Sequence, residues 1–272
     1  MKTSHLVQSG SASIAAESIG NGPPIVFLHA NVADSRMWRA QMESIGTDHL
    51  AIAYDRRGFG KTVTGPERFS AVSDLMTVID ATSDSSPAIL VGCSRGGRVA
   101  IDAALQYPER FRALALIAPS ISGAPEVTNP SEIRDLMRHA AEVEESGDLD
   151  KLNAVKARMW LDGPLGAEGR VKGDARRLFL DMNGTALRLK ADMEAEIETA
   201  PAYHLLGNIS MPTLVISGDL DFPFIQERSR HIAKTVHKGT HHEMHGAAHL
   251  PSLEQPEEIT ELLADFIYAN RT

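Results

Sequence analysis

The feature that most constrains the fold is the join between two apolar runs in AILVGCSRGGRVAI, residues 88–101. The first run has the length of a buried strand, and the second has the composition of a helix that packs on a sheet. Glycines at the join permit a turn that is too sharp for bulkier residues. Residues 92–96, GCSRG, also fit the pattern G-x-S-x-G, which presents a nucleophilic serine between a strand and a helix. Because the pentapeptide also fits a plain glycine-rich turn, Ser94 needs partners elsewhere in the chain.

Short apolar runs alternate with amphipathic stretches along most of the chain, which is typical of a parallel sheet covered by helices. A weakly alternating run followed by GNGPP at 20–24 suggests an antiparallel ribbon near the start. Strands are expected at 24–29, 49–55, 88–93, 112–118, 211–218 and 239–246. Helices are expected at 34–45, 70–82, 95–107 and 256–267. The sequence therefore predicts an α/β protein with a mostly parallel, twisted sheet and helices on both faces.

The pattern changes after residue 119, where about eighty residues follow with helical spacing and no convincing strand. The stretch NPSE at 129–132 is a good helix start, because a capping residue precedes a proline and a glutamate follows three positions after the cap. Later helices are expected at 149–160 and at a stretch that carries Leu189, Met193 and Ile197. We therefore expect an all-helical cap at 121–208, inserted into a core made of 1–120 and 209–272.

A serine is a poor nucleophile without a base, and a histidine at the same edge of the sheet can supply one. His249 lies in a loop between the last expected strand and the closing helix. The base in turn needs a carboxylate that orients its ring. Asp219 and Asp221 both follow the strand at 211–218, so either can reach this edge. A strand-end aspartate is also a common turn former, and residue type alone does not choose between the two.

The chain order Ser94, Asp221, His249 resembles that of the α/β-hydrolase fold family. Three further stretches are similar to motifs of this family, namely VFLHAN at 26–31, YDRRGFGKT at 54–62 and GAAHLPSLEQPEEI at 246–259. The resemblance covers the chain from about residue 20 to its end, apart from the cap. It implies the α/β-hydrolase fold, and within that fold it is closest in kind to serine esterases and lactonases that carry a helical cap.

The resemblance also implies roles for individual residues. It favours Asp221 over Asp219 as the orienting acid, and it implies that the backbone N–H groups of Asn31 and Arg95 form an oxyanion hole. Ala30 departs from the family pattern, because a glycine usually stands there. Arg95 departs as well, because an uncharged residue is more usual after the nucleophile. The implied activity is hydrolysis of a small to medium carboxylic ester or lactone through an acyl-enzyme.

The cap is expected to set the choice of substrate, and its apolar residues either roof a pocket or form a small core of the cap itself. The pocket candidates are His29, Met137, Met159, Trp160, Phe179, Leu187 and Met193. The side chain of Arg95 has three destinations, namely a cap acid, a substrate carboxylate or solvent. Solvent is the expectation.

Two other functions stay open on the same fold. Similar triads hydrolyse a carbon–carbon bond of a vinylogous diketone, and a triad-bearing receptor holds a small ligand with slow turnover. A serine at position 94 argues against the dehalogenase and epoxide hydrolase branches, which have aspartate at this turn. Fold analogy does not choose among the remaining functions.

Composition excludes several classes of partner. The net charge is −9, from 27 basic and 36 acidic residues, so nucleic acid and anionic membranes are not expected to bind. No apolar run approaches the roughly 18 residues of a membrane span, and no secretory signal is visible. Cys93 is the sole cysteine, which fits a reducing compartment, so a cytoplasmic protein is expected. The histidine-rich stretch at 241–249 lacks the H-E-x-x-H spacing, and no metal or organic cofactor is expected. The oligomeric state stays open.

Overall fold

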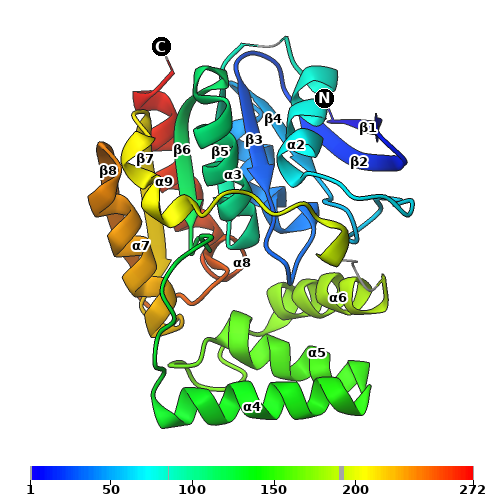
Figure 1. Ribbon diagram of the computed structural model, residues 1–272, viewed down its shortest axis with the longest axis vertical. Coiled ribbons are helices and arrows are strands. Elements are labelled where there is room, and N and C mark those ends of the chain that lie inside the picture. Colours follow the sequence, from blue (N-terminus) through cyan, green and yellow to red (C-terminus); the bar gives the residue numbers. More distant parts are fainter. Residues whose placement is uncertain (1, 85, 190–192, 272) are drawn as a thin grey trace.

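An eight-stranded sheet forms the centre of the computed structural model, which describes residues 2–84, 86–189 and 193–271 (Figure 1). Its strands lie in the order β1-β2-β4-β3-β5-β6-β7-β8. Their bounds are β1 Lys2–Ser9, β2 Ala12–Ile19, β3 Pro24–Leu28, β4 Leu50–Tyr54, β5 Ala88–Cys93, β6 Phe111–Ile117, β7 Pro212–Gly218 and β8 Lys238–Met244. The run from β4 through β8 in this order is parallel, and β1 and β2 form an antiparallel ribbon at the edge beside β4. The expected mostly parallel sheet is thus confirmed.

Helices cover both faces of the sheet, because its central strands are apolar on both sides. Along β3, Phe27 packs in one hydrophobic cluster with residues such as Leu263 of the closing helix. The next residue, Leu28, packs in a second cluster with Leu75 on the opposite face. Figure 1 shows α3 and α7 in front of the sheet and α9 behind it. The helices of the core are α1 Arg39–Ile45, α2 Ala71–Thr82, α3 Arg95–Gln106, α7 Pro223–Thr235, α8 Pro251–Glu254 and α9 Pro256–Ala269.

The helix expected at 34–45 begins differently from the prediction. Its first turn is a 3-10 helix, Ser35–Trp38, and α1 follows directly. Asp34 Oδ1 accepts a hydrogen bond from the N–H of Arg36 only two residues on, at 3.0 Å. Such a short-range cap favours a tight first turn.

In the described part of the segment between β6 and β7 lie the α-helices α4 Ser131–Ser146, α5 Leu149–Ala157 and α6 Gly173–Leu189, and a π-helical turn at Arg158–Asp162. Figure 1 shows α4, α5 and α6 gathered at one end of the molecule, with both termini toward the other end. The helix expected to carry Leu189, Met193 and Ile197 is wrong, because Met193–Ala195 form a 3-10 turn and Glu196 forms a β-bridge, while 190–192 lie outside the described residues. Leu189 and Ile197 are 48% and 45% exposed, so their spacing marks surface residues rather than a buried helical face.

The boundaries of the cap at 121 and 208 stay a prediction. Short 3-10 turns occupy Met193–Ala195, Ala202–His204 and Leu206–Asn208, and another at Pro108–Arg110 precedes β6. We call residues 193–211 the return segment of the cap, because they lead back to β7. Ala202 and Leu206 in this segment pack in the same hydrophobic cluster as Leu28, so the segment contacts the core before β7 begins. No helix within the described ranges is long and apolar enough to span a membrane.

Candidate active site

Ser94 occupies a strained turn between β5 and α3. Its backbone angles are φ 54° and ψ −115°, a conformation that costs free energy for a residue with a side chain. The flanking glycines are required by close backbone approach. A Cβ on Gly92 would lie 2.6 Å from the carbonyl oxygen of Gly96, and a Cβ on Gly96 would lie 2.2 Å from that of Leu28. The sequence therefore folds into the sharp elbow that the pattern at 92–96 predicts.

Neighbouring strands hold the elbow in place. The N–H of Ser94 donates to the carbonyl of Ile117 at the end of β6, at 2.9 Å. The carbonyl of Ser94 accepts from the N–H groups of Arg98 and Ser120, each at 3.1 Å. These bonds leave the half-buried Ser94 side chain at the carboxyl end of the parallel strands. A strained conformation persists where the surroundings fix it in this way.

His249 and Asp221 form a buried pair at the same edge. His249 Nδ1 lies 2.7 Å from Asp221 Oδ2, and the two side chains are 2% and 0% exposed. The other carboxylate oxygen of Asp221 accepts from the N–H of Phe222 at 2.7 Å. Asp219 lies elsewhere, because its carboxylate meets the N–H of Gly246 and the ring of His245. The structure thus brings Asp221, and not Asp219, to His249.

The loop that carries His249 passes directly beside the elbow. The thiol of Cys93 donates to the carbonyl oxygen of His249, with a sulfur–oxygen distance of 3.5 Å. Burial raises the pKa of this thiol well above its usual value, so it stays protonated. No hydrogen bond joins Ser94 Oγ to His249 within the described part of the chain. Bonds of this kind often form only when substrate binds.

The backbone N–H groups of Asn31 and Arg95 have no hydrogen-bond acceptor among the described residues, so both are free to donate to a ligand. Arg95 is the first residue of α3, where the helix dipole adds positive potential. The Asn31 side chain accepts from Arg56 Nη2 at 2.8 Å. Burial lowers the pKa of Arg56 to about 10, so this guanidinium is still charged near neutral pH. Ala30 is fully buried, so an alanine fits where the family usually has glycine.

His29 lies in the turn that precedes Asn31, and its place in a substrate pocket stays a prediction. The side chain is fully buried, and both ring nitrogens are used inside the turn. Nε2 accepts from the N–H of Arg56 at 3.0 Å, and Nδ1 therefore carries the hydrogen that is donated to the carbonyl of Ala30 at 2.7 Å. Burial and the nearby Arg56 hold the pKa of His29 well below its ordinary value. A neutral His29 thus fixes the turn that presents Asn31.

Trp160 is the pocket candidate that contacts the pair directly. Its ring centroid lies 4.6 Å from that of His249 and 4.8 Å from that of Phe222. Trp160 lies in the π-helical turn, a local irregularity often found at functional sites.

The remaining pocket candidates have other surroundings. Met159 and Phe179 are buried in the hydrophobic cluster between cap and core, as expected for a packing role. Met137 is 40% exposed, because α4 buries the face of Ile133 and Ala140 instead, and its place in a pocket roof stays a prediction. Leu187 is half-buried, and the side chain of Met193 lies outside the described residues.

The side chain of Arg95 does not extend into solvent, which corrects a further expectation. Arg95 Nη2 lies 2.6 Å from Glu196 Oε2, and the two side chains are 17% and 11% exposed. Glu196 belongs to the return segment of the cap and itself forms an isolated parallel bridge with Phe69. An acid from the cap therefore pairs with the residue that follows Ser94.

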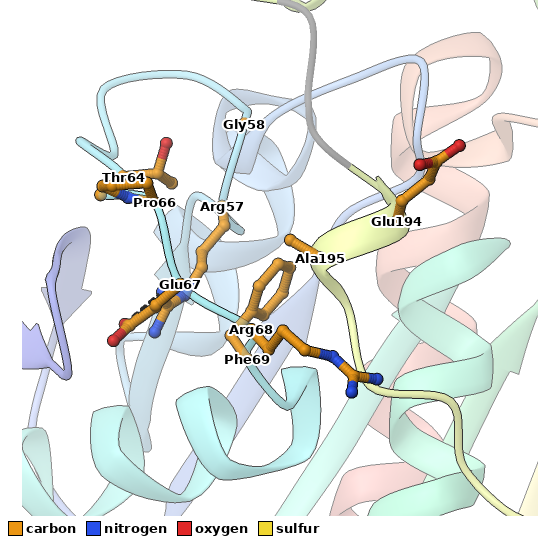
Figure 2. A pocket seen from close by; sticks show the side chains of 10 residues that line it. Arg57, Gly58, Thr64, Pro66, Glu67, Arg68, Phe69, Glu194 and Ala195 are labelled. Carbon is orange, nitrogen blue, oxygen red and sulfur yellow. Dashed lines mark hydrogen bonds and ion pairs between the residues drawn. The ribbon is translucent and has the colours of Figure 1, made fainter.

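A cleft of about 400 Å³ lies between the loop after β4 and the return segment of the cap (Figure 2). Figure 2 shows Arg57 and Glu67 together on one wall and Glu194 and Ala195 on the other. Arg57 Nη1 donates to Glu67 Oε1 at 2.7 Å, so this arginine is held in the loop. Ser94, His249 and Asp221 do not line the cleft, so it is not the site of the chemistry discussed above. No group of three or more metal-binding side chains occurs among the described residues.

Sequence reasoning missed Glu254, a buried acid beside His249. Its carboxylate accepts from the N–H groups of Ala248 and Leu250, at 2.7 and 2.9 Å. A signal was present, because an acid directly before a helix-starting Gln-Pro pair can turn back toward the preceding loop. Only the fold shows that it turns toward the histidine.

Comparisons with known proteins identify the family and the fold. A model described as the alpha/beta hydrolase family matches residues 25–262. The chain is 23% identical over 264 residues to 3-oxoadipate enol-lactonase 1 of Acinetobacter baylyi, covering 96% of this chain and 94% of that protein. It is 28% identical over 170 residues to an epoxide hydrolase of Caballeronia sordidicola, covering 60% of this chain and 50% of that protein. A malate-bound thermophilic esterase from Thermogutta terrifontis has the same fold, with a TM-score of 0.78, 24% identity and coverage of 100% of both chains.

Proposed function

The chain belongs to the alpha/beta hydrolase family, and from that membership we propose that it is a serine hydrolase of small to medium carboxylic esters or lactones. We propose Ser94 as the nucleophile, His249 as the general base and Asp221 as the orienting acid. The curated relatives support hydrolase chemistry, and one of them is named as an enol-lactonase. The reaction runs through an acyl-enzyme and calls for no metal or organic cofactor. The cytoplasmic location stays a prediction.

One observation supports this proposal more than any other. A serine with a φ of 54° directly follows β5, at the sheet edge where His249 and Asp221 share a hydrogen bond of 2.7 Å. Strain of this kind collects at functional sites, because it presents a side chain in a position that relaxed backbone does not allow. A base held by a buried carboxylate at the same edge as such a serine supports the proposed triad.

In the first half of the reaction, Ser94 Oγ attacks the carbonyl carbon while its proton passes to His249 Nε2. The Asp221 carboxylate keeps its bond to Nδ1–H and stabilises the imidazolium that forms. The N–H groups of Asn31 and Arg95 donate to the oxyanion of the tetrahedral intermediate. Removing one such donor costs roughly 10²- to 10³-fold in kcat in related chemistry.

In the second half, the imidazolium of His249 gives its proton to the leaving oxygen, and the carbon–oxygen bond of the ester breaks. An ester releases its alcohol at this step, whereas the hydroxyl of an opened lactone stays attached to the acyl group. Water then attacks the acyl-enzyme, with His249 again as the base, and Ser94 is regenerated with release of the carboxylic acid.

The epoxide hydrolase among the relatives raises a different chemistry. Ser94 favours acyl transfer, because the epoxide hydrolase branch that this fold resembles uses an aspartate at the elbow. Hydrolytic cleavage of a vinylogous diketone and slow-turnover ligand binding use the same three side chains, and they are the alternatives to this proposal. A panel of simple esters, lactones and such diketones separates them by rate.

The test of the proposal is Ser94→Ala. We expect a folded protein whose kcat on p-nitrophenyl acetate falls on the order of 10⁶-fold, with no labelling by a fluorophosphonate. Ser44→Ala, at an exposed serine on α1, is the matched control. It should keep both the turnover of p-nitrophenyl acetate and the labelling by a fluorophosphonate. Substantial turnover by Ser94→Ala would remove this residue from the mechanism. Ligand-dependent stability with negligible turnover by the wild type would favour the receptor instead.

A further inference from the structure

The loop that carries His249 is held by a buried carboxylate at the end of α8. Glu254 Oε2 accepts from the N–H of Ala248 at 2.7 Å, and Oε1 accepts from the N–H of Leu250 at 2.9 Å. These two residues flank His249 in the chain, so one carboxylate fixes the backbone on both sides of it. The Glu254 side chain is 0% exposed. The position of the imidazole therefore depends on the charge state and position of this acid.

The counter-charge for this carboxylate comes from the cap. Burial raises the pKa of Glu254, because the charged form loses its hydration, and Arg170 opposes that shift. Arg170 Nη2 donates to Glu254 Oε2 across the boundary between cap and core. A buried carboxylate without a partner is strongly unfavourable. The acid that holds the histidine loop thus relies on an arginine from another part of the chain.

Arg170 is itself fixed by several carbonyl groups. Its Nε and Nη2 donate to the carbonyls of Asp162 and Leu161 in the cap, at 3.1 and 2.9 Å. Its Nη1 donates to the carbonyl of Gly246 in the histidine loop, at 2.7 Å. The Asp162 carboxylate accepts from the N–H of Gly169 at 2.8 Å, which folds the segment back so that Arg170 faces the core. One guanidinium therefore joins the cap to the histidine loop.

The cap segment of residues 160–170, which ends at Arg170, contacts the loops of the proposed triad in two other places. The Trp160 ring lies 4.6 Å from the His249 ring. Gly163 lies so close to the core that a Cβ there would be 2.4 Å from the carbonyl oxygen of Leu220 and 2.6 Å from Cβ of Ala248. Leu220 belongs to the loop of the orienting acid, and Ala248 belongs to the loop of the base. Docking of this segment and the placement of the base are thus structurally linked.

We infer that Arg170 is a positioning residue, which acts through Glu254 to hold His249 in place while the cap segment is docked. The inference rests on the proposed function, in which His249 is the base. Loss of the guanidinium leaves the Glu254 carboxylate uncompensated, so it moves or takes up a proton and releases the two peptide groups beside His249. A displacement of about 1 Å in a reacting group costs on the order of 10²-fold in rate.

The first test is Arg170→Met, which keeps the aliphatic stem and removes the charge. We expect kcat to fall about 10- to 100-fold with KM within about threefold, because the base rather than substrate binding is affected. Arg170→Ala with added guanidinium, at concentrations far below those that unfold proteins, should regain part of kcat. Arg110→Met is the matched control, since Arg110 is similarly exposed and pairs with Asp80 far from the site. A folded Arg170→Met with the kcat of the control would overturn the inference.

A double-mutant cycle tests whether Arg170 acts through Glu254. Glu254→Gln keeps the shape of the side chain and removes its charge. Residues that act as one unit give non-additive effects. The double variant Arg170→Met/Glu254→Gln should therefore be no slower than the slower single variant. Effects that multiply would show that the two residues act independently and would contradict the inference.

A spectroscopic readout keeps this test separate from the proposed activity. The His249 Nδ1–H proton, bonded to Asp221, is expected as a downfield proton NMR signal in the wild type and in Arg110→Met. It should shift or broaden in Arg170→Met, or in Arg170→Lys if the methionine variant does not fold. An unchanged signal in the arginine variants overturns the inference. A wild type that hydrolyses no ester or lactone would refute the proposed function, while the signal would still decide the role of Arg170.

Discussion

Among the ion pairs that join the cap to the core in the described residues, two lie beside the candidate site and have opposite polarity. Beside His249 the cap supplies the cation, Arg170, and the core supplies the anion, Glu254. Beside Ser94 the core supplies the cation, Arg95, and the cap supplies the anion, Glu196. A charged contact thus joins the cap to each side of the candidate site, and these two contacts differ in what else depends on them.

The difference lies in the partners of the two carboxylates. Glu254 holds two backbone N–H groups of the histidine loop as well as its arginine. The hydrogen bonds around Glu196 are instead made by the backbone of the return segment. There the N–H of Phe69 donates to the carbonyl of Ala195 at 3.0 Å, and the N–H of Ile197 donates to the carbonyl of Phe69 at 2.7 Å. Loss of charge should therefore disturb the histidine side more than the serine side.

The largest expected effect on stability is that of Glu254→Gln. The amide leaves Arg170 without its anion and points an NH₂ group at one of two backbone N–H donors, so a buried bond is lost and a repulsive contact is formed. We expect the free energy of unfolding to fall by about 3 kcal/mol. Urea denaturation measures it, with Glu261→Gln at an exposed site on α9 as the control. A loss as small as that of the control would mean that the carboxylate contributes little here.

The matched change on the serine side is Glu196→Gln, for which we expect a loss of about 1 kcal/mol. The β-bridge to Phe69 remains, because it uses backbone groups alone. The kcat should change less than in Glu254→Gln, since the proposed oxyanion donor of Arg95 is its backbone N–H. Both variants are measured in the same urea series and on the same ester. Equal losses of unfolding free energy in Glu196→Gln and Glu254→Gln would contradict the expectation that the histidine side depends more on its ion pair.

These two contacts also show what sequence can and cannot predict. The elbow at Ser94 is predictable because its glycines and serine lie within five positions, and the steric requirement is local. The sheet is predictable because apolar runs of strand length alternate with helical periods. The resemblance to a family identified Asp221, which the residues alone left equal to Asp219.

The cap was much less predictable. Arg170 and Glu254 are 84 residues apart, and nothing in local spacing pairs one arginine with one acid. The apolar spacing at Leu189 and Ile197 predicted a helix that the fold does not have. Surface apolar residues imitate a helical face when the neighbouring element is unknown. His29 shows the same limit, because its role depends on Arg56, which only the folded chain brings to it.

The last expected effect is a difference in pH response, which is at most comparable to the effect of Glu196→Gln, and it comes from His29 on the serine side. Its pKa in the folded protein lies well below the ordinary value of 6.5. As pH falls below about 6.5, the unfolded chain takes up a proton that the folded chain does not. The contribution of His29 is therefore fully present above that pH and is lost as the solution becomes more acidic, by at most about 1.4 kcal/mol per pH unit.

The free energy of unfolding of the wild type should thus fall between pH 6.5 and 5.5, and His29→Gln should flatten this slope. The glutamine can still accept from the N–H of Arg56, so the comparison concerns the slope rather than the absolute stability. His237→Gln, at an exposed histidine, is the control and should keep the slope of the wild type. An unchanged slope in His29→Gln would mean that this buried ring does not resist protonation. The turn that presents Asn31 would then tolerate a charged His29, which contradicts the assignment of this ring as neutral in the folded protein.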